Sequence, residues 1–251
     1  MSDATPRVSI VVPAYNEGDD ILPFLAKVVT TVKHDFELLV VVDTPDDSTV
    51  AAVETVARED PRIRTVVNTH GRGPAQAIRY GFDVARARTV VVTMADGSDD
   101  PRQIDPLTEL VERGVVVAAG SRYMAGGQQI GGERFKRALS RLAGQSLHLF
   151  AGIGTRDATN SFKAYNADFV RTVTIQSRAG FEIGLELTAK ARRARLPVAE
   201  LPTIWLDRTE GESNFQLRKW IPQYLRWYFF AFGKPLPITD IEAAAGAKGS
   251  K

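Results

Sequence analysis

Residues 8–12 read VSIVV, a short run of β-branched side chains that Pro13 ends. Such a run is typical of a strand that is buried on both faces. Similar runs follow in residues 36–42 (FELLVVV) and residues 89–94 (TVVVTM), with apolar residues at helical spacing between them. Strands that alternate with helices predict parallel βαβ units. We therefore expect an α/β protein with a Rossmann-like, mostly parallel central sheet and helices on both faces.

The composition excludes several classes of protein and site. The 251 residues are 44% hydrophobic and 25% charged, which is typical of a globular protein and argues against disorder or a coiled coil. The chain has no cysteine, so thiolate metal sites, disulfides and cysteine nucleophiles are excluded. The three histidines lie far apart in the sequence, which disfavours a histidine-built zinc site. Any metal would have to be held mainly by oxygen.

Charge and the two chain ends bear on partners and location. The 32 basic and 30 acidic residues nearly cancel, so no nucleic-acid partner is expected. The N-terminus lacks the pattern of a signal peptide, and no run of ~18 apolar residues occurs, which predicts a cytoplasmic protein. Residues 1–233 are expected to form a single domain. Residues 234–251 are small, polar and proline-bearing, which predicts a disordered tail.

Acidic residues stand where three of the predicted strands end. Glu17 follows the first strand, Asp43 the second and Asp96 the fourth. The carboxyl ends of parallel strands share one edge of the sheet, and ligands bind outside that edge. The alternative is that each carboxylate caps the helix that follows it. The convergence of three such residues favours a ligand site.

An ordered series of motifs resembles the family-2 glycosyltransferases of the GT-A fold. The series begins with VSIVVPAYNEGDDI and VVVD, followed by N-x-x-G-x-G-x-A-x-A-I-R-x-G at residues 68–81 and an acidic loop at residues 96–101. Four later segments are similar to polyprenyl-phosphate (dolichol-phosphate) mannosyl- and glucosyltransferases: GSRYMAGG (120–127), DATNSFKAY (157–165), GFEIGLEL (180–187) and DRTEGESNF (207–215). The resemblance covers residues 7 to about 230.

The resemblance implies an inverting transfer of mannose or glucose from a nucleotide-diphosphate sugar, with GDP-mannose favoured, to a polyprenyl phosphate. It also implies the residues that bind the nucleotide sugar, which are Pro13, Ala14, Tyr15, Glu17, Asp43, Asn68, Gly71, Gly73, Gln76, Asp96 and Lys163. Lys163 takes the place of an arginine that is usual in the family. For Gly71 and Gly73 the alternative is a tight turn before a helix that begins at Pro74.

The metal motif of the family is D-x-D, and this chain departs from it. Met94 stands at the first aspartate position and Asp96 at the second. The resemblance implies Mg²⁺ or Mn²⁺ as cofactor, with Asp96, Ser98 and Asp99 as candidate ligands. Mg²⁺ is bound through one or two carboxylates plus substrate phosphates, but methionine offers no hard oxygen. Either fewer protein atoms hold the ion, or the dependence on metal is reduced.

A second group of residues matches family positions that contact phosphates of donor or acceptor. These are Arg122, Lys136, Ser140 and Arg208. Glu182 matches an acidic position near the sugar, although a carboxylate at a helix N-terminus is the competing explanation. With Asp96, these residues form the predicted catalytic set.

The segment WIPQYLRWYFFAFG at residues 220–233 holds seven aromatic residues. Aromatic residues mixed with Arg218, Lys219 and Arg226 predict an amphipathic helix, about residues 216–233, that lies on a membrane surface. The protein would then be peripheral on the inner face of the membrane. The alternative is a helix that packs in the core or between the subunits of a homodimer.

Two other functions remain open at this point. The same fold could glycosylate a soluble acceptor, since no spanning segment ties the chain to a membrane. Met94 in the metal motif leaves open an inactive module that only binds nucleotide sugars.

Overall fold

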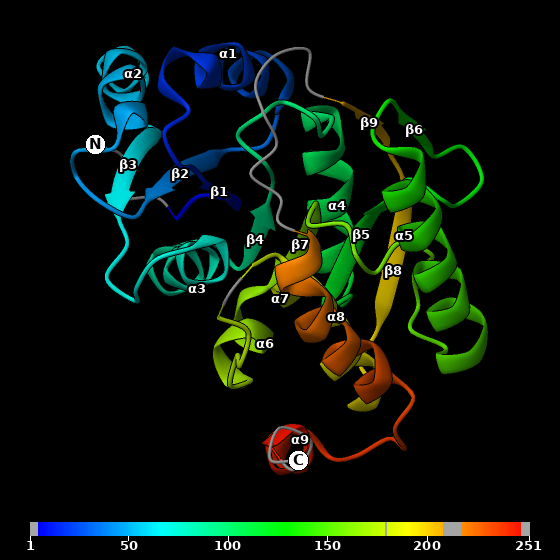
Figure 1. The fold of residues 1–251 in the computed structure, drawn as a ribbon. Coiled ribbons are helices and arrows are strands. Elements are labelled where there is room, and N and C mark those ends of the chain that lie inside the picture. Colours follow the sequence, from blue (N-terminus) through cyan, green and yellow to red (C-terminus); the bar gives the residue numbers. More distant parts are fainter. Residues whose placement is uncertain (1–4, 179, 208–216, 247–251) are drawn as a thin grey trace.

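The computed structural model describes residues 5–178, 180–207 and 217–246 and contains a seven-stranded sheet in the order β3-β2-β1-β4-β7-β5-β8 (Figure 1). The strands of this sheet are β1 (Val8–Pro13), β2 (Phe36–Val42), β3 (Ile63–Val67), β4 (Thr89–Val92), β5 (Val117–Ser121), β7 (Lys163–Asn166) and β8 (Val198–Pro202). A separate parallel pair is formed by β6 (Gln128–Ile130) and β9 (Ile204–Leu206).

The predicted parallel sheet is confirmed, with one exception. β1 pairs in parallel with β2 and β4, β2 with β3, and β5 with β8. β7 lies between β4 and β5 and is antiparallel to both. This strand therefore joins two parallel halves of the sheet.

Helices cover both faces, as the sequence predicts. One face is covered by α1 (Leu22–Thr31), α2 (Ser48–Ala57) and α4 (Ile104–Glu112), and the other by α3 (Pro74–Val84), α6 (Ala167–Thr172) and α7 (Glu182–Arg193). Two short 3-10 turns, η1 (Gly18–Ile21) and η2 (Pro101–Gln103), precede α1 and α4.

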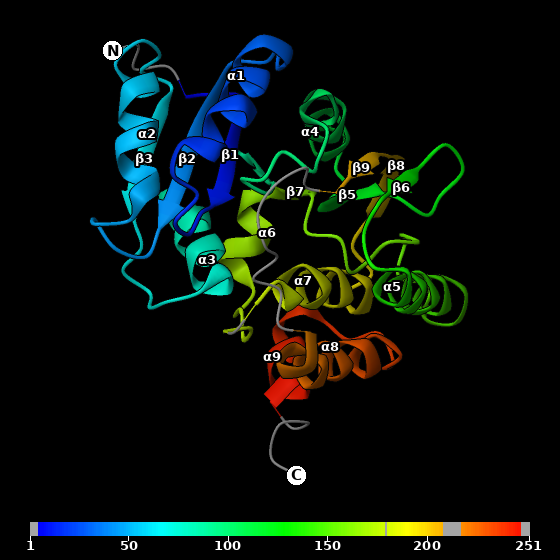
Figure 2. The same ribbon diagram turned by 45° about the horizontal axis from the view of Figure 1, so that its top comes forward.

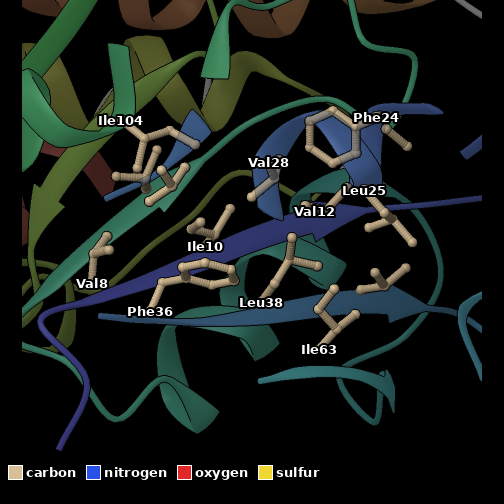
Figure 3. Close-up of a cluster of buried hydrophobic side chains, with 14 of the residues drawn as sticks. Val8, Ile10, Val12, Phe24, Leu25, Val28, Phe36, Leu38, Ile63 and Ile104 are labelled. Atoms are coloured by element: carbon tan, nitrogen blue, oxygen red, sulfur yellow. The ribbon is translucent and has the colours of Figure 1, made fainter. Parts of the chain in front are cut away.

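Alternation along the central strands separates the two apolar cores. Figure 3 shows Val8, Ile10 and Val12 of β1 on the side of α1, where Phe24 and Leu25 pack against them. The intervening Val11 belongs to the cluster on the opposite face. Successive side chains of a strand point to opposite faces, so a strand of only apolar residues contributes to both cores.

Two further helices lie outside the sheet layers. α5 (Arg134–Ser146) continues into a π-helical turn, η3 (Leu147–Ala151). α8 (Leu217–Ala231) packs against α7, and both views show it on the side of the molecule that also carries α5 (Figures 1 and 2). No helix in the described ranges is long and apolar enough to cross a bilayer.

The prediction of a disordered tail is wrong for residues 238–246. These residues form α9 (Ile238–Gly246), and both Ile241 and Ala245 are buried in a third cluster with Trp227 and Phe230. The i, i+4 spacing of Ile241 and Ala245 places both side chains on one face of a helix, which is how so short a segment gains a packing partner. Residues 247–251 lie outside the described part of the chain.

The aromatic helix divides its aromatic residues between core and surface. Trp227 and Phe230 are buried, and the Trp227 indole donates a hydrogen bond to Ser177 Oγ at 3.1 Å. Phe229 is 59% exposed and Phe232 is 40% exposed. One face of α8 is thus a core-packing surface, and contact with a membrane remains a prediction for the other face.

Truncation of Ile241 tests the order of the C-terminal helix. We expect Ile241→Ala to lower the free energy of unfolding by about 2–4 kcal/mol, since it removes a fully buried side chain. Urea unfolding followed by circular dichroism measures this difference. The exposed Thr239→Ala change on the same helix is the control and should alter stability by less than about 0.5 kcal/mol. Equal, small effects of both changes would mean that α9 does not pack on the domain.

Candidate active site

One large cleft, of about 1320 Å³, opens at the carboxyl ends of β1, β2 and β4 and continues between α5, α7 and α8. Residues that follow these three strands line it, as the convergence of strand ends predicts. They include Pro13, Ala14, Tyr15, Glu17, Asp43, Asp96 and Ser98. The three strand-end carboxylates therefore do share one site.

Asp43 is held in place by the turn that follows β3. Its Oδ1 accepts a hydrogen bond from Asn68 Nδ2 at 3.0 Å, and its Oδ2 accepts one from the Gly73 amide at 2.8 Å. Asn68 Nδ2 also donates to the Gly71 carbonyl oxygen. Gly73 has φ = 103°, a left-handed conformation that few residues other than glycine adopt. The turn thus orients Asp43 toward the cleft.

Only part of this turn reaches the cleft. Gly73 lines it, together with Arg72, which sequence reasoning missed. Asn68, Gly71 and Gln76 are not among the described lining residues. Asn68 and Gly71 lie behind Asp43, and for Gly71 this agrees with the alternative of a tight turn.

The loop after β1 is tied to the start of α2 by Asp47. Both oxygens of Asp47 lie 3.0–3.1 Å from the Asn16 amide, and its Oδ1 also accepts from the Thr49 amide at 2.9 Å. The Glu17 amide donates to Thr49 Oγ1 at 3.0 Å. Asp47 therefore caps a helix and shapes the cleft wall.

Asp96, at the second aspartate position of the metal motif, lines the cleft. Its Oδ1 accepts a hydrogen bond from the Ser98 amide at 3.0 Å, and Met94 lines the cleft beside it. Asp99 is buried behind this wall, where its Oδ2 accepts from Thr93 Oγ1 at 3.1 Å and the Met94 amide at 3.2 Å. Burial and then the charge of Asp96 raise the pKa of Asp99 to about 7.

The oxygens here fit a hard divalent cation that also takes ligands from phosphate and water. The described residues hold no group of three His, Cys, Asp or Glu side chains that could cage an ion. Ser98 Oγ and Asp99 Oδ1 are buried without a hydrogen-bond partner in the described part of the chain. Such oxygens beside Asp96 match a site completed by substrate. Met94 adds no oxygen ligand.

Arg122 follows β5 and forms the best-defined ion pair of the cleft. Its Nε lies 2.7 Å from Asp157 Oδ2 and its Nη2 lies 2.8 Å from Asp157 Oδ1, while its amide also donates to Oδ2 at 3.0 Å. Burial disfavours the charge of Arg122, but the Asp157 carboxylate outweighs that effect and raises the pKa of the guanidinium. Asp157 is fully buried, and its role as the partner of Arg122 was not predicted.

α5 brings two more predicted phosphate-binding residues to Arg122. Ser140 Oγ lies 3.4 Å from Arg122 Nη2 and 2.6 Å from Thr159 Oγ1. Lys136 lines the same stretch of the cleft, where its Nζ donates to Glu133 Oε1 at 2.7 Å. The structure therefore brings Arg122, Lys136 and Ser140 to one stretch of the cleft, and their contact with phosphates stays a prediction.

The prediction that Lys163 contacts the nucleotide sugar is wrong. Lys163 is fully buried, and its Nζ donates to the Ala158 carbonyl oxygen at 3.1 Å and to that of Asn160. Burial lowers the pKa of Lys163 to about 7. The antiparallel strand β7 turns this side chain toward α7, where a Cβ on Gly184 would lie 3.4 Å from Nζ. Lys163 supports the turn at residues 158–160 from beneath.

Glu182 does not line the described part of the cleft. Glu182 is the first residue of α7 and is buried; it is not among the lining residues, whereas Phe181 and Leu185 are. The pKa of the Tyr224 hydroxyl is raised, first by the burial of Tyr224 and second by the negative charge of Glu182. A place in the first turn of a helix agrees with the alternative interpretation of Glu182. Arg208 lies outside the described residues.

The far half of the cleft is apolar. α5 contributes Leu139, Leu142 and Ala143, α7 contributes Leu185, and α8 contributes Ile221, Tyr224, Leu225 and Tyr228. Ser146 Oγ and Tyr228 Oη lie 2.9 Å apart and hold α5 against α8. The cleft thus runs from carboxylates at the strand ends, past a cationic group, into an apolar groove.

Comparison with known proteins identifies the family and several relatives of this chain. A sequence profile described as glycosyl transferase family 2 matches residues 9–174. Polyprenol monophosphomannose synthase of Mycolicibacterium smegmatis is 30% identical over 216 residues, covering 84% of this chain and 81% of that protein. Undecaprenyl-phosphate mannosyltransferase of Micrococcus luteus is 28% identical over 213 residues, covering 83% of this chain and 87% of that protein.

Solved structures agree with the fold. Glucosyl-3-phosphoglycerate synthase of Mycobacterium tuberculosis, crystallised with Mn²⁺ and UDP, matches with a TM-score of 0.66 at 17% identity, covering 92% of this chain and 81% of that one. A mannosyltransferase of Pyrobaculum calidifontis, in complex with GDP-mannose and Mn²⁺, matches with a TM-score of 0.63 at 20% identity, covering 98% of this chain and 70% of that one. The profile match, the relatives and the GT-A architecture together show that this chain belongs to glycosyl transferase family 2 and is a glycosyltransferase.

Proposed function

We propose that the protein transfers a hexose, with inversion, from a nucleotide-diphosphate sugar to a polyprenyl phosphate. GDP-mannose is the favoured donor, and UDP-glucose is the second candidate. The observation that carries this proposal is the single cleft whose polar end lies at the strand edge and whose apolar end lies between α5 and α8. A lipid phosphate needs both environments at once. The names of the relatives in Mycolicibacterium smegmatis and Micrococcus luteus support the same acceptor class.

The proposed reaction needs alignment more than a strong base. An oxygen of the lipid phosphate forms a bond to the anomeric carbon while the bond from that carbon to the diphosphate oxygen breaks, and the nucleoside diphosphate leaves. The acceptor phosphate is already ionised near pH 7, so no residue has to remove a proton from it. Cationic side chains that hold two anions close together supply the main advantage.

The cationic group between the two halves of the cleft would hold the acceptor phosphate. Arg122 offers a planar fork that suits phosphate oxygens, and Asp157 fixes its orientation. Lys136 and Ser140 add a charge and a hydroxyl from α5. Asp157 is a positioning residue, because it acts through Arg122.

A divalent cation would assist the donor side. Mn²⁺ in the two solved structures compared above supports this cofactor, and Mg²⁺ is the alternative. When bound, the ion would neutralise charge on the departing diphosphate. Asp96 and Ser98 would hold it, and Asp99 is the third candidate ligand.

We also propose a peripheral position at the inner face of the membrane. A polyprenyl phosphate resides in a bilayer, so the enzyme has to meet it at the surface. The exposed Phe229 of α8 and Phe232 just after its end support this placement, because aromatic side chains favour the membrane interface.

A transfer assay tests the function. Purified protein is incubated with labelled GDP-mannose or UDP-glucose, Mn²⁺ or Mg²⁺, and a short polyprenyl phosphate. We expect labelled glycolipid from at least one donor. Intact nucleotide binding without transfer to the polyprenyl phosphate from either donor would reject the lipid acceptor. Transfer to a soluble acceptor alone would favour the rival enzyme, and binding without any turnover would favour an inactive module.

Asp96 tests the donor side. We expect Asp96→Asn to lower kcat by roughly 10²-fold or more, because the leaving diphosphate loses a charge-stabilising group. The exposed Asp20→Asn change is the control and should leave kcat unaltered. Equal turnover of the wild type and Asp96→Asn would contradict the assignment of Asp96.

Arg122 tests the acceptor side. Arg122→Lys keeps the charge but loses the fork, so we expect kcat/KM for the lipid phosphate to fall roughly 10- to 100-fold, as for one lost charged hydrogen bond. The KM for the nucleotide sugar should change little. Arg156→Lys is the matched control, because Arg156 also pairs with a carboxylate, Glu200, but does not line the cleft. A rise in the KM for the nucleotide sugar, with no change for the lipid phosphate, would place Arg122 on the donor side.

A further inference from the structure

α5 presents an apolar face to solvent. Phe135, Leu142, Leu149 and Phe150 of α5 and η3 are between 69% and 77% exposed, and Leu139 is 41% exposed. We call these five residues the α5 stripe. Large apolar side chains that gather on one exposed face usually mark an interaction surface.

The orientation of α5 follows from Gly144 on its opposite side. A Cβ at Gly144 would lie 2.1 Å from the Arg156 carbonyl oxygen, so this face of the helix lies directly on the backbone of the domain. Nine residues separate Phe135 from Gly144, which is about two and a half helical turns and therefore half a rotation. The stripe accordingly lies on the side of α5 opposite this backbone contact, in agreement with the exposure of its members.

Cationic residues flank the stripe. Residues 134–146 contain four cationic side chains and no carboxylate. At about 100° per residue, Arg134 and Arg141 lie along one flank and Lys136 along the other. An apolar stripe between cationic flanks is the pattern of a helix that lies in the interface of an anionic bilayer.

The stripe is continuous with the mouth of the apolar groove. Leu139 and Leu142 belong to the stripe and also line the cleft. Across the groove, α8 exposes Leu225 and Phe229, and the contact between Ser146 and Tyr228 joins the two helices. A surface that seats the stripe would therefore also cover the groove entrance.

We propose that the α5 stripe docks on an anionic phospholipid bilayer and thereby opens the apolar groove directly into the lipid. This proposal rests on the proposed function, because it gives the route by which a lipid acceptor enters the cleft. α5, rather than α8, supplies most of the inserted surface, because Trp227 and Phe230 of α8 are buried in the core. Arg134 and Arg141 would bind lipid phosphates at the rim.

A second copy of the chain fits this surface less well. A symmetric contact through α5 would bring the same arginine-bearing helix of two copies together. No carboxylate in residues 134–146 offsets the repulsion, and Glu133 at the N-cap is already paired with Lys136. An anionic bilayer supplies the missing negative charge.

Vesicle flotation tests the proposal. The full chain is mixed with vesicles of phosphatidylglycerol and phosphatidylcholine, or of phosphatidylcholine alone. We expect binding to the anionic vesicles that weakens with added salt. The double variant Phe135→Ser/Phe150→Ser should bind at least about tenfold more weakly, and Arg141→Glu about fivefold or more. Thermal unfolding confirms that these surface variants are folded.

Matched controls lie at the opposite end of the sheet. Arg58→Glu at the C-cap of α2 reverses an exposed charge, and Val67→Ser on β3 removes an exposed apolar side chain. Both elements lie far from α5 in the two ribbon views. Both variants should bind vesicles like the wild type. Equal binding by the stripe variants and the wild type, or no binding of the wild type to anionic vesicles, would overturn the proposal. So would a dimer in solution that only the stripe variants disrupt.

Transfer assays with a water-soluble and a membrane-embedded acceptor distinguish the docking role of the stripe from the proposed function. Stripe variants should transfer sugar to a short, water-soluble polyprenyl phosphate at the wild-type rate, but lose transfer to a long-chain acceptor embedded in anionic vesicles. Equal loss with both acceptors would place the stripe in the catalytic machinery and overturn the docking role. Stripe-dependent vesicle binding without transfer to any polyprenyl phosphate would reject the proposed function and leave the docking surface standing.

Discussion

The parallel pairing of β1 with both β2 and β4 is the constraint on which the proposed donor side of the cleft depends. Val12 stands opposite Val40, and Val11 opposite Val92, so the chain leaves all three strands at one edge. Every residue of β1 and β2 is buried, and the two apolar clusters take alternate side chains. A slip of one residue would exchange the two faces, so burial itself holds the strand-end carboxylates in register.

The proposed acceptor side depends on a different contact. β5 ends just before Arg122, and the segment that leads into the antiparallel strand β7 carries Asp157. Their buried pair joins two parts of the chain that are 35 residues apart. Loss of one partner would leave a buried charge, which typically costs about 3–5 kcal/mol. The same pair thus stabilises the fold and aims a cation at the junction between the polar and apolar halves of the cleft.

Much of this arrangement is predictable from the sequence, but the surroundings of individual side chains are not. Strand runs and their terminal carboxylates predict the sheet and its edge, and motif positions single out Arg122 and Ser140, which the structure brings close together. A motif position does not specify side-chain orientation, however, and β7 turns Lys163 into the interior. Spacing alone likewise cannot say whether the apolar face of a helix meets protein or lipid. α8 and the short α9 therefore pack on the domain where the sequence favours a surface helix and a disordered tail.

The central claim is that one cleft receives a nucleotide sugar at the strand edge and a lipid phosphate between α5 and α8. Photocrosslinking with a polyprenyl phosphate that carries a benzophenone on its chain tests this most directly. The account predicts labelled peptides from the groove walls around Leu142 and Leu225, and protection of both by unmodified polyprenyl phosphate. Labelling that falls elsewhere, or that the unmodified lipid does not reduce, would contradict the account.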